Sequence, residues 1–150
     1  MKTKLSVQSK WSAAAAAIAA CGLAFSVSAA AADMNRLPAT RTQGEISYLS
    51  GGIGQSEAHA MEHAAKGYPL ELEFVAKAKP KDEFLANVKV RITDAHDKLV
   101  LDTTADGPFL LAKMPAGKYA ISADHDGRVQ HREIEIAAKE HRRVVFAWNS

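Results

Sequence analysis

One short motif in this chain has the residue types and the spacing of a metal site. The segment His59-Ala60-Met61-Glu62-His63 matches the pattern H-x-x-E-H, which one class of zinc peptidases uses. Histidines four residues apart on a helix face the same side, so both imidazoles can bind one metal ion. The glutamate between them can polarise a metal-bound water. The candidate metal ligands are therefore His59, Glu62 and His63.

The context of this motif argues against a peptidase. Peptidases with this motif are far larger, and they take a third ligand from a distant acidic residue in a closed cleft. The two histidines also lie on the polar face of the expected helix, opposite Met61. We therefore expect either solvated side chains or a non-catalytic metal site, with adventitious binding of nickel or copper as a further alternative.

Two other segments carry side chains or backbone that can bind an ion. His96-Asp97 and His125-Asp126 both lie in expected hairpin turns, and they would join in a metal site if the two turns met at one end of a sandwich. Ser50-Gly51-Gly52-Ile53-Gly54 precedes a helix and could bind an anion through backbone N–H groups. Aspartate favours turns, and this glycine-rich segment has neither a P-loop lysine nor full G-x-G-x-x-G spacing. Turns and a plain flexible connection are therefore the simpler interpretations.

The element that must position the H-x-x-E-H motif is a short helix over residues 56–66. Ser56 is a suitable N-cap, Glu57 suits the first turn, and Gly67 stands where a helix ends. Apolar residues recur at helical spacing on one face, at Ala58, Met61, Ala65 and Tyr68. The motif is thus expected on the opposite, solvated face.

After Pro69 the apolar period changes from helical to two, which is typical of β-strands. Asp126-Gly127 is a strong hairpin signal, and a change of parity in the strand after it predicts a β-bulge near 131–133. Short strands separated by turns favour a β-sandwich. The expected strands are centred on residues 70–74, 88–92, 99–101, 108–111, 119–123, 128–136 and 144–148.

Part of this strand region resembles a known family. The relevant segments are Val88-Lys89-Val90, Asp106-Gly107-Pro108-Phe109 and Met114-Pro115-Ala116-Gly117-Lys118-Tyr119. They are similar to the strand, the acidic-glycine-aromatic step and the Leu-Pro-Pro-Gly-x-Tyr turn of carboxypeptidase regulatory-like domains. Methionine for leucine and alanine for proline are departures that keep the physics of the turn, because proline fixes φ and glycine permits the tight bend.

The resemblance implies a fold and no reaction. It covers residues 84–136, about half of the chain beyond the first 32 residues, and implies a small transthyretin-like antiparallel β-sandwich preceded by one short α-helix. Such domains are accessories in carboxypeptidases and carry no catalytic site. Residues 48–74 also resemble the front part of short exported proteobacterial proteins of unassigned function, which join a Gly-Gly-x-Gly segment and a helix to this sandwich.

The N-terminal residues have the pattern of a secretion signal. Lys2, Lys4 and Lys10 form a basic start, and an apolar, alanine-rich stretch without charge follows as far as Ala32. Small residues suit cleavage at any register from Ala29 to Ala32. Residues 1–32 are therefore expected to form a signal helix that is removed.

Two alternatives to a cleaved signal stay open. Residues 11–32 are long enough to span a bilayer, but alanine and serine partition weakly into hydrocarbon. Ile18 to Cys21 resembles a lipobox, in which Cys21 would become a lipidated N-terminus, but the apolar run continues beyond Cys21 instead of giving way to a polar tether. The protein is thus expected in the periplasm or secreted, or lipid-anchored at Cys21.

Removal of the signal changes the charge and the cysteine content. Three of the 19 Lys and Arg residues lie in it and none of the 17 Asp and Glu residues, so the remainder has a formal net charge of about −1. This charge excludes nucleic acid as an expected partner and leaves a membrane only if Cys21 is lipidated. Cys21 is the one cysteine, so the mature chain has no disulfide. The mature chain divides into a flexible leader (33–44), a glycine-rich segment with the helix (45–68) and the sandwich (69–150).

The sequence supports one principal function and one alternative. No catalytic set and no cofactor motif stands out, and exposed sheet edges favour strand addition. We therefore expect an exported non-enzymatic envelope protein, a β-sandwich module that binds another envelope protein or a surface polymer. The alternative is a periplasmic metal-binding protein that uses the His59/His63 pair.

Overall fold

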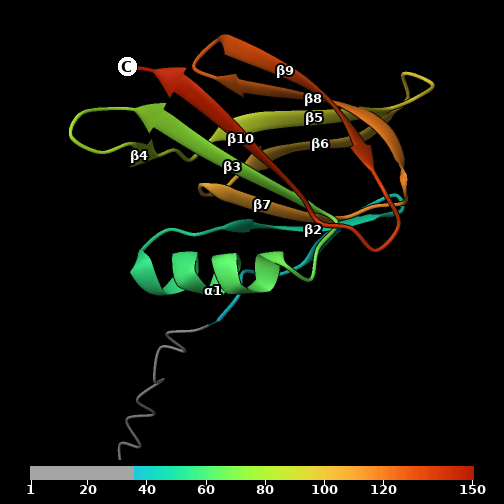
Figure 1. Cartoon of the computed structure of the whole chain (residues 1–150), viewed down its shortest axis with the longest axis horizontal. Coiled ribbons are helices and arrows are strands. Elements are labelled where there is room, and N and C mark those ends of the chain that lie inside the picture. The colour runs from blue at the N-terminus through green and yellow to red at the C-terminus, as the bar shows by residue number, and fades with distance from the viewer. Residues whose placement is uncertain (1–35) are drawn as a thin grey trace, which may run out of the picture. The chain divides into compact units, whose positions relative to one another are not determined.

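The structure is a computed structural model that describes residues 36–150. The expected signal, its cleavage positions from Ala29 to Ala32 and Cys21 lie outside the described residues. Within residues 36–150, no helix has the length and apolar character needed to cross a membrane. Two β-sheets lie face to face and one short helix covers the outer side of one of them (Figure 1). The predicted mostly-β sandwich with one short helix is confirmed.

Sheet A holds six strands and sheet B holds four. Every described pair of strands is antiparallel except β3 and β10, which run parallel over their full length. Sheet A has the order β1 (Arg41–Gln43), β2 (Ile46–Gly51), β7 (Phe109–Lys113), β3 (Leu70–Lys77) and β10 (Arg142–Asn149), and β4 (Glu83–Phe84) pairs with β3. Sheet B has the order β6 (Leu99–Ala105), β5 (Val88–Asp94), β8 (Gly117–His125) and β9 (Arg128–Ile136).

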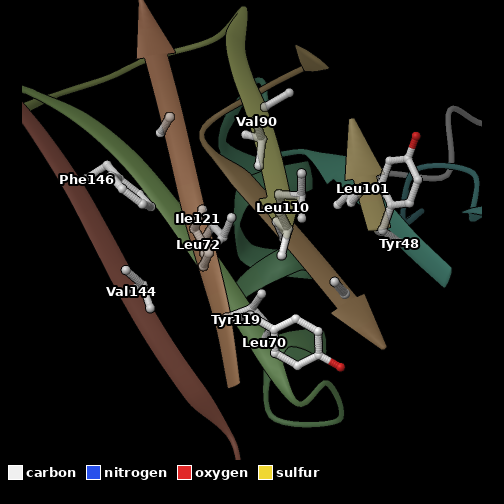
Figure 2. Close-up of a cluster of buried hydrophobic side chains, with 14 of the residues drawn as sticks. Tyr48, Leu70, Leu72, Val90, Leu101, Leu110, Tyr119, Ile121, Val144 and Phe146 are labelled. Atoms are coloured by element: carbon white, nitrogen blue, oxygen red, sulfur yellow. The ribbon is translucent and has the colours of Figure 1, made fainter. Parts of the chain in front are cut away.

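The core lies between the sheets and follows from the two-residue period of the strands (Figure 2). Alternate residues of β3 and β10 point inward, and Phe74, Phe146 and Trp148 have ring centroids 6.0–6.5 Å apart. Tyr119 is buried near the start of β8, and its hydroxyl donates to the Pro115 carbonyl at 2.7 Å. This core has the alternating inward residues typical of two packed sheets.

The helix α1 (Gln55–Ala65) packs on the outer face of sheet A, away from sheet B (Figure 1). It forms a second apolar cluster, in which its buried Ala58, Met61 and Ala65 meet residues that point outward from β2 and β7: Leu49, Phe109 and Leu111. The apolar face predicted for the helix is therefore confirmed. Because β2 lies between β1 and β7 in sheet A, the segment 45–68 belongs to the same fold as the sandwich.

Two local predictions at the start of the chain differ from the structure. Residues 41–43, expected in a flexible leader, form β1 and pair with β2 through a turn at Gly44. The helix begins at Gln55 with Gly54 as its N-cap, and no side chain caps it there. Ser56 is therefore the second residue of the helix and not its cap, because the left-handed φ of 82° at Gly54 turns the chain one step earlier.

The predicted bulge in β9 is wrong, although the predicted Asp126-Gly127 hairpin is present. The β8–β9 register runs unbroken from Gly117↔Ile136 to His125↔Arg128, and the register shift in sheet B lies in the β5–β6 pair. The hydrophobic parity was misleading because Val129 faces solvent, 48% exposed. Two polar residues take the inward positions of β9 instead: Gln130 donates to the Ala147 carbonyl of β10, and Arg132 lies over the Phe146 ring.

Candidate functional site

The H-x-x-E-H motif lies on solvent-exposed turns of α1. His59, Glu62 and His63 are all exposed, as the helical pattern predicts. Within residues 36–150, no three His, Cys, Asp or Glu side chains come close enough together to hold a metal ion. Two imidazoles on an open helix surface leave the remaining metal positions to water, which gives a weak and unselective site.

The two histidine-aspartate turns lie at opposite ends of sheet B. In the β5–β8 register, Asp94 beside the first turn is opposite Tyr119, whereas Lys89 at the other end of β5 is opposite Asp124, next to the second turn. Five residues of extended strand separate these positions by roughly 17 Å. His125 packs instead against Trp148, with ring centroids 5.6 Å apart. The turns therefore do not form a joint metal site.

The glycine-rich segment before α1 is packed against neighbouring chain, which replaces the expected flexible connection. Gly51 and Gly52 are buried, and a side-chain carbon on Gly107 would overlap the backbone of Gly51. The Gly52 N–H donates to the Glu57 carboxylate at 2.7 Å. The protein's own carboxylate thus takes one of the backbone donors that an anion would use in this glycine-rich segment.

The most unusual charged group is one that sequence reasoning missed. Glu71 and Glu73 point outward from β3, yet only 6% and 8% of their surfaces are exposed. A buried carboxylate is costly unless it is paired and hydrogen-bonded. In the parallel register Arg143 of β10 is opposite Glu71, and Val145 is opposite Glu73. The bases that meet the two carboxylates therefore come from the far end of the chain.

Four side chains form what we call the β3–β10 ion network: Glu71, Glu73, His141 and Arg143. The Arg143 guanidinium bonds Glu73 through Nε, at 3.1 Å, and through a terminal nitrogen, and its Nε lies 3.6 Å from Glu71. The hydrogen bond to Glu73 is the main cause that raises the pKa of Arg143. Burial opposes this rise, and the charges of Glu73, Glu71 and Glu62 raise the pKa further. Both carboxylates are thereby paired with basic side chains.

His141 joins the network to the chain just before β3. Its Nε2 lies 2.9 Å from Glu71 Oε2, and its Nδ1 lies 2.8 Å from the Tyr68 carbonyl oxygen. Both neighbours are acceptors, so each ring nitrogen that carries a hydrogen has a partner to which it can donate. The network therefore fixes the start of β10 beside the start of β3.

An apolar surface adjoins this network on the half of the outer face that α1 leaves uncovered. We call it the β3–β10 patch and define it by Val75, Phe84 and Val145. Phe84 is 53% exposed and Val145 41% exposed, and the Phe84 ring stands edge-on to Phe109, with centroids 5.4 Å apart. The patch forms a hollow of about 440 Å³ that is also lined by Glu73, Lys77, Lys81, Asp82 and Arg143.

Four of the five charged residues that line the hollow are paired with one another, and the fifth is Lys81. Lys77 Nζ lies 2.6 Å from Asp82 Oδ2 on one side, and the Glu73–Arg143 pair stands on the other. Exposed apolar side chains within a polar rim are typical of a surface that binds another molecule. The sequence holds a signal for this site, because Phe84 and Val145 are apolar residues that stand among charged ones. Only the strand pairing shows that the two residues lie close together.

Two comparisons with known proteins give no match. No protein-family model matches this chain, and the search of curated proteins finds no match. The assignment of a site therefore rests on the geometry of residues 36–150, and the carboxypeptidase regulatory-like resemblance of residues 84–136 stays an expectation.

The ion network predicts a specific loss of stability when its base is removed. Arg143→Met leaves Glu73 buried without its partner, so we expect destabilisation of about 1–2 kcal/mol, a value reduced because the guanidinium is half exposed. Urea unfolding measures it, and the loss should shrink in a Glu73→Gln background. The control is Arg91→Met, whose pair with Asp102 is exposed at both ends and should cost less than about 0.5 kcal/mol. Equal losses in the two variants would contradict the network.

The exposed histidine pair predicts weak metal binding that depends on both imidazoles. Calorimetric titration with Ni²⁺ should show an affinity in roughly the micromolar range or weaker, and His59→Ala/His63→Ala should abolish it. The matched control, His96→Ala/His131→Ala, should leave it unchanged. Nanomolar affinity, or affinity that survives the first double replacement, would show that a metal site exists that this geometry does not account for.

Proposed function

We propose that this protein is an exported, non-enzymatic binding module of the bacterial envelope, and that its partner docks on the β3–β10 patch. The observation that carries the proposal is the exposure of Phe84 and Val145 on a sheet face whose other half is covered by α1. Large apolar side chains in a hollow are the usual anchors of protein–protein interfaces. The favoured partner is another envelope protein.

The choice of a protein over a surface polymer follows from the chemistry of the patch. Its centre is apolar, and four of its five lining charges, all except Lys81, are paired within the chain. A polysaccharide needs many outward donors and acceptors, whereas the centre of this patch consists of the apolar side chains of Val75, Phe84 and Val145. An apolar side chain of a protein fills such a hollow without leaving a polar group unpaired.

Two features support the remaining parts of the proposal. The basic start and the alanine-rich stretch of residues 1–32 support export to the periplasm or beyond, or a lipid anchor at Cys21 if that residue is modified. The pairing of Glu71 and Glu73 with basic side chains supports a non-enzymatic role, because a general acid or base needs access to a substrate. The resemblance to carboxypeptidase regulatory-like domains agrees with an accessory module.

Site-specific photo-crosslinking in cells tests the proposed interface. A benzophenone amino acid in place of Phe84 keeps an aromatic ring at the patch, and we expect one discrete adduct with a protein of the envelope. The same group in place of Val129, which is also about half exposed but lies on the outward side of β9 in sheet B, is the matched control. It should give no such adduct.

A second variant separates docking from chance proximity. Val145→Asp places a charge in the hollow while the side chain stays in solvent, so the fold should be kept and the Phe84 adduct should disappear. Circular dichroism and the thermal midpoint confirm folding of each variant. Equal adducts from both positions, or an adduct that survives Val145→Asp, would exclude the β3–β10 patch as the interface.

A further inference from the structure

A cleft opens between the β1–β2 hairpin of sheet A and the β5–β6 turn of sheet B. Its volume is about 610 Å³, within the range of small-ligand sites. Leu99 and Val100 supply apolar surface, and Leu99 is 42% exposed although it lines a concave site. The cleft is separate from the β3–β10 patch, with which it shares no lining residue.

Contacts between the two sheets fix the shape of this cleft. The Gln43 side chain of β1 bonds both backbone groups of Asp102 on β6: its Nε2 donates to the Asp102 carbonyl at 3.3 Å, and its Oε1 accepts from the Asp102 N–H at 2.6 Å. The Tyr48 hydroxyl donates to Thr103 Oγ1 at 3.1 Å. These bonds join the first hairpin to the edge of sheet B, so the cleft is preformed.

The polar groups of the cleft are mainly acceptors. Tyr119 is only 9% exposed and stands at the end of the core, with its hydroxyl directed away from the apolar side chains (Figure 2). That hydroxyl donates its single hydrogen to Pro115, which also lines the cleft. The oxygen therefore has only lone pairs left to offer, and a ligand that meets it must bring a donor.

The charged groups of the cleft also favour a ligand that brings donors and carries positive charge. Three carboxylates line it, Glu45, Asp94 and Asp102, against one ammonium group, that of Lys98, and the Asp102 carboxylate is already paired with Arg91. The backbone N–H groups of His96 and Lys98 donate to Asp94 Oδ1, and the first of these bonds is the main cause that lowers the pKa of Asp94, so its carboxylate is charged at neutral pH.

The Tyr119 hydroxyl responds to the resulting negative potential. Burial is the main cause that raises its pKa, and the negative charges of Asp94 and Glu45 raise it further. Two carboxylates from different sheets therefore act on one point of the cleft.

We propose that this cleft binds an organic cation, a guanidinium or ammonium group carried on a short alkyl chain. The alkyl chain lies on Leu99 and Val100, and the cationic head meets the carboxylates of Glu45 and Asp94 and the Tyr119 oxygen. This ligand class matches both halves of the lining, whereas an anion would face the carboxylates of Glu45 and Asp94 and a neutral alkane would leave the acceptors unpaired.

Titration with n-butylguanidinium tests the proposal on the folded chain, because this probe stays charged at every accessible pH. Two-dimensional ¹H–¹⁵N NMR should show saturable shifts at residues 43–46, 98–102 and 119.

Glu45→Gln should weaken binding about fivefold, the effect of one charge at close range, and Lys98→Gln should strengthen it. Glu133→Gln, which removes a carboxylate outside this cleft, is the matched control and should change nothing. Glu45, Lys98 and Glu133 are exposed, so each variant should fold.

Two further probes identify the source of the cation and the limits of the site. A blocked tripeptide Gly-Arg-Gly that binds more tightly than n-butylguanidinium indicates an arginine side chain of a protein, and weaker binding of the peptide indicates a free small molecule. Either result supports the proposal. Shifts produced equally by butanoate or butanol, no saturable shift with n-butylguanidinium, or an affinity unchanged in Glu45→Gln would overturn it.

Discussion

Burial of two carboxylates on the outward face of β3 is the constraint on which the arrangement of sheet A depends. Glu71 and Glu73 lie between the helix-covered strands and the edge of the sheet, where water reaches them poorly. Only a strand that brings bases beside them makes this burial tolerable. The last strand does so by running parallel to β3, which sets Arg143 opposite Glu71 and lets His141 bond to the chain before β3. Arg143 and His141 therefore both pair with the carboxylates and fix the position of β10.

The same arrangement separates the covered and uncovered halves of the outer face. The helix packs on β2 and β7 through Met61 and its neighbours, and the ion network borders it on the side of β3 and β10. Beyond the network the face turns apolar again at Phe84 and Val145, with no further element to cover it among residues 36–150. At the other edge of sheet A, the first hairpin joins sheet B and encloses the acidic cleft. The two proposed binding surfaces therefore lie where the chain's own elements leave parts of sheet A uncovered.

Local patterns in the sequence predict most of the strands, the helix face and the Asp126-Gly127 hairpin, because each depends on neighbouring residues. The failures have long-range causes. Val129 seemed to break the parity of β9 because its inward positions are filled by polar residues that bond to β10. The glycine-rich segment seemed flexible because its tight contact, with Gly107, comes from 56 residues later. The partners of Glu71 and Glu73 could not be predicted, since an expected antiparallel sandwich does not pair β3 with a parallel last strand. The exposed positions of His59 and His63 were predictable from helical spacing alone.

Hydrogen exchange along β10 tests most directly whether the ion network positions this strand. In a Glu71→Gln/Glu73→Gln variant, the carboxylate charges are lost while side-chain shape and the inward apolar residues are kept. We predict that amides in the first half of β10, residues 142–145, exchange at least about fivefold faster, which corresponds to roughly 1 kcal/mol. Amides near Trp148, which Gln130 and the core hold in place, and those of β5 and β8 should change little. Unchanged exchange at residues 142–145, or the same acceleration in every strand, would contradict the account.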